Sequence, residues 1–126
     1  MQRLYIYSVW HYIVRIALIE RSRDNMEILK VFISQPMRDK TDEQIINERQ
    51  HAINIIKKKY GKDVEILDSF FKDAPHESTP VWFLGKSLEV LSQANLAYFI
   101  GDWKKYRGCK IENLVAHEYG IPTIEE

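Results

Sequence analysis

The stretch Arg107-Gly108-Cys109-Lys110-Ile111-Glu112-Asn113-Leu114-Val115-Ala116-His117-Glu118-Tyr119-Gly120-Ile121-Pro122 decides the fold that the sequence predicts. Its pattern predicts a glycine turn at Gly108, a helix over 109–119, a glycine stop and a last strand over 121–124. The carboxylate of Glu112 would then lie one turn after Gly108, in the first turn of the helix. Helix propensity does not require a glutamate there, so Glu112 is the first candidate for chemistry.

The rest of the chain continues this alternation of strand and helix. Short apolar, β-branched runs predict strands, and stretches with helical spacing of apolar residues predict helices between them. The strands are expected over 28–34, 64–67, 96–100 and 121–124, and the helices over 42–60, 81–93 and 109–119. We therefore expect an α/β fold, a small flavodoxin- or Rossmann-like three-layer sandwich with a parallel sheet of about four strands.

Two helix starts and one helix end have clear local signals. Thr41 and Gln44 have the spacing of a capping box. Thr79 followed by Pro80 places an N-cap before a proline at the first helical position. Gly61 follows the first predicted helix, over 42–60, and is expected to end it.

Length and composition exclude several classes of protein. The 126 residues favour one domain, and 45% hydrophobic residues suffice for a sizeable core. The 18 basic and 18 acidic residues balance, so no charge pattern points to nucleic acid. The single cysteine, Cys109, excludes an intramolecular disulfide and fits a reducing compartment, so we expect a cytoplasmic protein.

Residues 1–25 differ in composition from the remainder. The run 4–19 is apolar and aromatic, but His11 and Arg15 interrupt it, unlike a membrane-spanning helix. We expect residues 1–25 to be an N-terminal hydrophobic extension of a domain that covers 26–126. The alternative is an arm that packs on a partner or lies on a membrane surface.

Polar loops are expected where the predicted strands end. Ligands of open parallel sheets bind beyond the C-terminal ends of the strands, where the loops 34–40, 68–78 and 101–109 meet. Glu112 at this edge is either a carboxylate nucleophile or an ordinary acid stabilised by the helix dipole. The loop Ser34-Gln35-Pro36-Met37-Arg38 either binds phosphate or ribose or is a turn formed by Pro36.

Further candidates lie in the other two loops. Asp68 follows the second strand and either binds sugar hydroxyls or starts an Asx turn. Asp102 follows the third strand, beside aromatic and basic residues that either stack on a base and bind phosphate or pack on a neighbouring subunit. These residues are Trp103, Tyr106 and Arg107. Cys109 has no evident base partner and is expected to pack.

Metal ligation is not indicated. His76 and Glu77 are adjacent, but no third ligand has fitting spacing, and His117 stands without a partner of the right kind. We therefore expect no metal site and no cofactor.

Several motifs together resemble a known family. They are Phe32-Ile33-Ser34-Gln35-Pro36-Met37-Arg38, Asp68-Ser69-Phe70-Phe71, Leu84-Gly85-Lys86-Ser87-Leu88, Ala94-Asn95-Leu96-Ala97-Tyr98-Phe99 and Gly108-Cys109-Lys110-Ile111-Glu112 with Gly120-Ile121-Pro122. Over about residues 28–125 the chain resembles a small group of bacterial and phage proteins in the nucleoside 2-deoxyribosyltransferase-like superfamily. The strand-loop opening and the Gly-x-x-x-Glu spacing are the most specific parts.

The resemblance implies an activity. The superfamily cleaves the N-glycosidic bond of nucleosides or nucleotides and passes the sugar to another base or to water. Its catalytic glutamate corresponds to Glu112, and its first loop, which contacts base and sugar, corresponds to Ser34–Arg38. Where these enzymes carry an aspartate before the third strand, this chain has Ser87, and where they carry an acidic residue at the start of that strand it has Asn95.

Three hypotheses follow from the sequence. The first is an N-glycosidase or 2-deoxyribosyltransferase with Glu112 as nucleophile, acting on a small nucleoside or nucleotide bound by Ser34–Arg38, Asp68, Asp102 and Gly108. The second is a non-catalytic protein that binds a nucleotide or nucleotide signal. The third is an assembly module that uses 4–19 and the loop around Trp103. Members of the superfamily tend to form homo-oligomers, which the resemblance implies here too.

Overall fold

The computed structural model describes residues 9–17, 28–61, 63–71 and 73–126. Its elements follow in the order β1 (Leu29–Ser34), α2 (Asp42–Tyr60), β2 (Val64–Ile66), α3 (Pro80–Leu91), β3 (Leu96–Phe99), the 3-10 helix η1 (Trp103–Lys105), α4 (Arg107–Glu118) and β4 (Thr123–Glu125). A further helix spans 9–17. Strands and helices thus alternate from β1 onward, as the sequence predicts.

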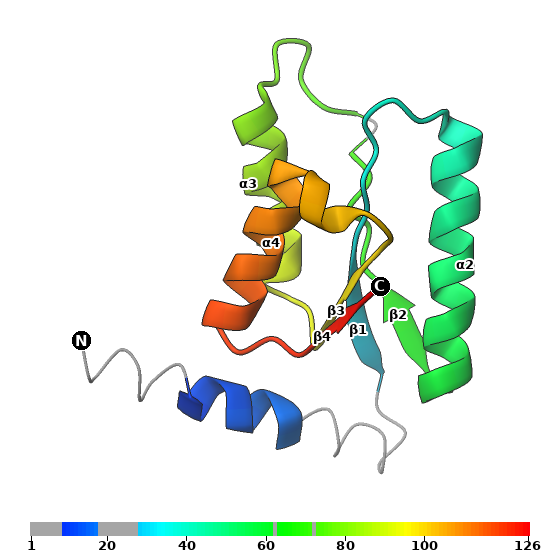
Figure 1. The fold of residues 1–126 in the computed structure, drawn as a ribbon. Coiled ribbons are helices and arrows are strands. Elements are labelled where there is room, and N and C mark those ends of the chain that lie inside the picture. Colours follow the sequence, from blue (N-terminus) through cyan, green and yellow to red (C-terminus); the bar gives the residue numbers. More distant parts are fainter. Residues whose placement is uncertain (1–8, 18–27, 62, 72) are drawn as a thin grey trace.

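The four strands form one parallel sheet in the order β2-β1-β3-β4. β1 and β3 are central, which explains why their residues are almost all buried. In Figure 1, α2 lies on one side of the sheet and α3 with α4 on the other. The prediction of a small three-layer α/β sandwich is confirmed.

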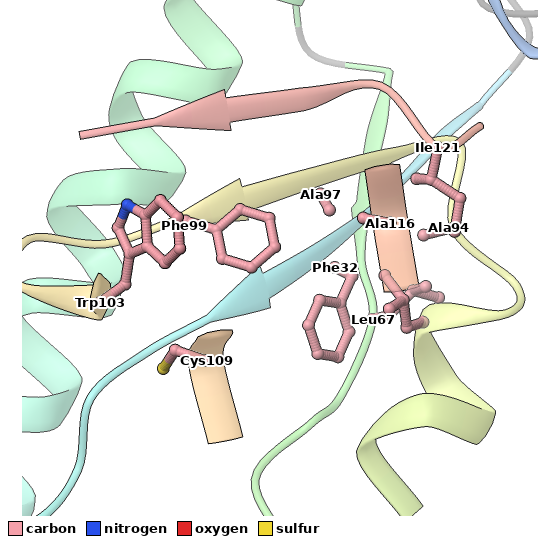
Figure 2. Packing of buried hydrophobic residues seen from close by; sticks show 10 residues of the cluster. Phe32, Leu67, Ala94, Ala97, Phe99, Trp103, Cys109, Ala116 and Ile121 are labelled. Atoms are coloured by element: carbon pink, nitrogen blue, oxygen red, sulfur yellow. The ribbon is translucent and has the colours of Figure 1, made fainter. Parts of the chain in front are cut away.

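Two apolar layers hold the helices on the sheet. On one face, Ala52 and Ile56 of α2 pack against β1 and β3. On the other face, Leu91 of α3 and Ala116 of α4 pack with residues that Figure 2 shows together, among them Phe32 and Phe99. Both faces of the central strands are covered, so their side chains are fixed. The residues at the C-terminal ends of these strands therefore have defined positions.

The expected local signals determine the helix ends. Thr41 accepts a hydrogen bond from the Gln44 backbone, and the Gln44 side chain accepts one from the Thr41 backbone, which forms the capping box. Thr79 caps α3 through the Trp82 N–H at 3.2 Å. Gly61 ends α2 with φ 88°, a conformation that glycine adopts without strain.

One local prediction at α4 is wrong. Gly108 does not form a turn before the helix, because α4 begins at Arg107 and Gly108 lies in its first turn. Glu112 therefore lies in the second turn, not the first. The N-terminal positive end of the helix dipole acts mainly on the first turn, so it stabilises the Glu112 carboxylate less than the sequence pattern suggested.

The helix over 9–17 contacts the domain at the N-terminal ends of the strands. Arg15 donates a hydrogen bond to the Ala94 carbonyl oxygen at 3.0 Å, just before β3. Gly120, just before β4, comes so close to this helix that a Cβ atom there would lie 2.6 Å from the Tyr12 nitrogen. Residues 1–8 and 18–27 of the predicted extension, and with them the predicted boundary at 25 and 26, lie outside the described residues.

Candidate functional site

A cavity of about 690 Å3 opens beyond the C-terminal ends of β1 and β2. It is enclosed by the loop after β1, the loop after β2, the first two turns of α3 and the start of α4. The residues that line it are Phe32, Ile33, Ser34, Gln35, Pro36, Met37, Ser69, Phe70, Phe71, Pro80, Val81, Phe83, Leu84, Ser87, Tyr106, Arg107, Gly108, Cys109, Ile111 and Glu112. All three predicted loops thus contribute to one site at the predicted edge of the sheet.

Glu112 is a buried carboxylate in the wall of this cavity, only 8% exposed. The Ser34 hydroxyl donates a hydrogen bond to its Oε1 atom at 2.7 Å. Ser34 is the last residue of β1, and its carbonyl accepts the Ile100 N–H at 3.0 Å. A central strand and a packed helix therefore fix the two side chains relative to each other.

The surroundings of Glu112 change its acidity. Burial raises the pKa of Glu112, and hydrogen bonds from the Ser34 and Ser87 hydroxyls act in the opposite direction. Ser87 comes from α3, so three elements converge on one carboxylate. A carboxylate with few hydrogen-bond donors and little water around it is a stronger base and nucleophile than one in solvent.

The loop after β1 divides between the cavity and the solvent. Gln35, Pro36 and Met37 line the cavity. The Gln35 amide donates a hydrogen bond from Nε2 to the Ile45 carbonyl at 2.7 Å, which ties the loop to α2. Arg38 is exposed and does not line the cavity. Four of the five predicted residues of this loop, counting Ser34, are therefore brought to the site.

The two predicted aspartates lie outside this cavity. Asp68 accepts a hydrogen bond from the Phe70 N–H at 3.0 Å, which is the Asx turn that the sequence offered as one alternative. Together with Arg49 it lines a second cavity of about 560 Å3. Asp102 is largely exposed, and its carboxylate lies 3.6 Å from Lys105 Nζ. The structure thus places neither carboxylate near Glu112.

The aromatic and basic residues around the start of α4 have different positions. Tyr106 and Arg107 line the cavity, as does Gly108. Trp103 is buried instead and lies next to Phe99 in Figure 2. The two ring centroids are 5.3 Å apart. Trp103 therefore stabilises the core, and its ring is not available to stack on a ligand or on a neighbouring subunit.

Cys109 lies between the site and the core. It is buried, and this burial raises the pKa of its thiol to about 11, although a hydrogen bond with Ser34 acts in the other direction. The thiol is therefore protonated at neutral pH and is not a nucleophile. This agrees with the packing role expected from the sequence.

From α3, the sequence pointed only to Ser87, at the position where the resembled enzymes carry an aspartate, and it missed the other residues of this helix that reach the site. Pro80, Val81, Phe83, Leu84 and Ser87 line the cavity from its first two turns. The Thr79-Pro80 signal did place the start of this helix, and a helix that follows a strand begins near the ligand edge of a parallel sheet. What the pattern could not show is which of its side chains point to Glu112.

Within the described ranges, no three His, Cys, Asp or Glu side chains lie close enough to hold a metal ion. Among the described helices, none is long and apolar enough to cross a membrane.

The fold and the site define the class: a small parallel α/β protein with a buried carboxylate in a largely apolar cavity at the ligand edge of its sheet. Comparison with protein-family models, with curated proteins and with solved structures finds no match for the chain. The resemblance to the nucleoside 2-deoxyribosyltransferase-like superfamily therefore stays a prediction.

Proposed function

We propose that the protein cleaves the N-glycosidic bond of a nucleoside or nucleotide, with Glu112 as the nucleophile. The observation that supports this most is the placement of Glu112: a buried carboxylate, held by the Ser34 hydroxyl at 2.7 Å, in a cavity large enough for a small ligand. The resemblance of the motifs around Ser34 and Glu112 to deoxyribosyltransferases supports the same assignment.

The proposed reaction proceeds in two displacements. An oxygen of the ionised Glu112 carboxylate attacks the anomeric carbon, and the bond to the base nitrogen breaks with its electron pair leaving on the base. The base takes up a proton, and the sugar stays on Glu112 as an ester. Water or a second base then attacks the same carbon and releases the carboxylate, which makes the protein a hydrolase or a transferase.

The lining of the cavity suits the two parts of such a substrate. Aromatic side chains of Phe70, Phe71, Phe83 and Tyr106 provide flat apolar surface for a nucleobase. The hydroxyls of Ser34 and Ser87 lie next to Glu112, where they can hydrogen-bond the oxygens of a sugar. The base would thus lie among the rings and the anomeric carbon near the carboxylate.

A second candidate function is ligand binding without turnover. It is favoured by the composition of the site, because Glu112 is the one Asp or Glu among the described residues that line the cavity. A departing base needs a proton, and no second carboxyl group lies there to supply it. On this view the protein recognises a nucleotide and releases it unchanged.

Base release measured by chromatography separates these functions. The wild-type protein is incubated with deoxynucleosides, ribonucleosides, their 5′-monophosphates and NAD, with and without a second free base. Alongside it, Glu112→Gln and Glu112→Ala remove the nucleophile, and Glu118→Gln makes the same change at an exposed position of α4. We expect free base from the wild type and Glu118→Gln but not from the Glu112 variants.

Two outcomes contradict the catalytic proposal. Base release that persists undiminished in Glu112→Ala excludes Glu112 as the nucleophile. If no compound loses its base but one raises the melting temperature and is recovered intact, the protein is a binder. A covalent sugar adduct on Glu112, detected by mass spectrometry after denaturation, is the positive sign of the proposed mechanism.

A further inference from the structure

The helix over 9–17 exposes apolar side chains to solvent, unlike most surface helices. Its one Asp, Glu, Lys or Arg side chain, Arg15, turns to the domain and hydrogen-bonds the Ala94 carbonyl oxygen at 3.0 Å. Four of its large apolar side chains face outward: Trp10 is 63% exposed and Ile13 55%, and Val9 and Tyr12 are exposed as well, whereas Val14 and Ile16 are half-buried. A helix that faces only water has the opposite distribution.

The helix is nevertheless attached to the domain. The close approach of Gly120 to the Tyr12 backbone and the Arg15 hydrogen bond join it to the segments before β3 and β4. Tyr119, the neighbour of Gly120, is 65% exposed at the same end of the molecule. We define the N-terminal apolar surface as Val9, Trp10, Tyr12, Ile13 and Tyr119.

We propose that this N-terminal apolar surface is the interface through which two copies of the chain associate. The five side chains expose on the order of 500 Å2 per copy, as large as patches that serve interactions on monomers. Two such surfaces bury about 1,000 Å2 when both are fully covered, which is the lower bound for a specific interface. A surface that meets its own copy across a two-fold axis needs no other partner.

Charge favours a second copy over a membrane surface. Helices that lie on membranes combine an apolar face with several Lys or Arg side chains that contact anionic headgroups. Here the one such cation of the helix, Arg15, is engaged with Ala94. The chain as a whole has a formal net charge of zero, so two copies do not repel each other.

The interface lies opposite the cavity. Figure 1 shows the helix over 9–17 at the N-terminal ends of the strands, whereas the cavity lies beyond their C-terminal ends. Association through this surface therefore leaves both cavities open to ligand. The proposal is independent of the proposed function, and its test uses no ligand.

Sedimentation equilibrium of the full chain tests the proposal. The protein concentration is varied over about 1–100 µM, a range chosen for an interface of this size. We expect the wild type to reach the mass of two chains and Ile13→Glu to stay at the mass of one. Ile46→Glu is the matched control, because Ile46 is 58% exposed on α2 and receives the same change. It should associate like the wild type.

A second variant covers the case in which Ile13→Glu does not fold. Trp10→Cys places a thiol on the proposed interface, and the native Cys109 is buried and does not compete. Mild oxidation should give a cross-linked dimer of Trp10→Cys, whereas Ile46→Cys should give none.

Two results overturn the proposal. One is association that Ile13→Glu leaves intact. The other is a wild type that is monomeric over the whole concentration range. If this monomeric wild type sediments with vesicles of phosphatidylserine and phosphatidylcholine and Ile13→Glu does not, the surface binds a membrane instead.

Discussion

Ser34 and Glu112 are 78 positions apart in the sequence, yet the Ser34 hydroxyl donates a 2.7 Å hydrogen bond to the Glu112 carboxylate. The first comes from the end of a central strand and the second from the helix packed on it. Burial of both residues makes this bond stronger than one in water and makes its loss costly. Most of the expected behaviour of the site follows from this pair.

Replacing Glu112 by Gln should stabilise the fold at neutral pH. Burial raises the pKa of Glu112 in the folded state, so ionisation disfavours that state, and stability falls as pH rises from the unfolded value of 4.5 through the folded pKa. Glu112→Gln removes this cost. We expect the free energy of unfolding to rise by about 1 kcal/mol, as for other functional residues that trade stability for activity.

Chemical denaturation at several pH values measures this effect. The stability gain of Glu112→Gln over the wild type should be present at pH 8 and vanish near pH 4, where the wild-type carboxyl is protonated in both states. Glu118→Gln, exposed on the same helix, should show no such gain. A gain for Glu112→Gln that is equal at both pH values would show that ionisation of Glu112 is not its cause.

Ser34→Ala should shift the pH dependence of the reaction to higher pH. The Ser34 hydroxyl stabilises the carboxylate form of Glu112 and thereby lowers its pKa. Without it the pKa rises further, and attack by the ionised carboxylate requires a higher pH. The rate of base release in single turnovers, measured from pH 4 to 9, should rise with pH in both proteins, with a later midpoint in Ser34→Ala.

Ser87→Ala is the companion variant, because Ser87 hydrogen-bonds the same carboxyl group from α3. It should shift the profile in the same direction. If Ser34→Ala lowers the rate equally at every pH, Ser34 contacts the substrate and does not tune Glu112.

Much of the fold could be predicted from the sequence because its signals are local. The Thr41 capping box, the Thr79-Pro80 start and the apolar run of β3 each depend on residues within one short segment. Alternation of strand and helix then leaves few topologies, and ligand position follows from the parallel sheet. The cavity was therefore expected at the edge where it lies.

The composition of the site could be predicted only in part. Ser34 and Glu112 meet through tertiary packing, so no spacing in the sequence shows that they bond. Asp68 satisfies a backbone N–H in its own loop, and Trp103 fills the core beside Phe99. Both outcomes depend on side-chain direction, which a pattern of residue types does not fix.

Gly120→Ala should destabilise the protein and loosen the helix over 9–17. Gly120 has φ +72°, where an L side chain is strained by about 1–2 kcal/mol, and a Cβ atom would lie 2.6 Å from the Tyr12 nitrogen. We expect a lower melting temperature and faster hydrogen exchange at the amides of 9–17.

Gly85→Ala is the matched control for Gly120→Ala. Gly85 lies inside α3, and a Cβ atom there meets nothing within 4 Å. Alanine favours helix over glycine by about 1 kcal/mol, so this variant should raise the melting temperature. Equal effects of the two substitutions would contradict the close contact between Gly120 and the N-terminal helix.

Glu125→Gln should lower stability to a small extent, and only above acidic pH. Partial burial acts to raise the pKa of Glu125, but the hydrogen bonds from Asn113 and His117 outweigh it and hold the pKa below the usual value. A carboxylate with a lowered pKa stabilises the fold above its unfolded value of 4.5 and loses this contribution as pH falls through the folded pKa. Because the Glu125 side chain is partly exposed to solvent, which screens its charge, the effect is a few tenths of a kcal/mol.

Urea denaturation at pH 7 and pH 3 with low and high salt tests this expectation. The difference between wild type and Glu125→Gln should be measurable at pH 7 and low salt, smaller at high salt because ions screen exposed charges, and smaller at pH 3 than at pH 7. Glu65→Gln, on the exposed side of β2, is the control and should match the wild type at both pH values. A deficit of Glu125→Gln that persists undiminished at pH 3 would assign it to lost packing between α4 and β4 instead of to the charge.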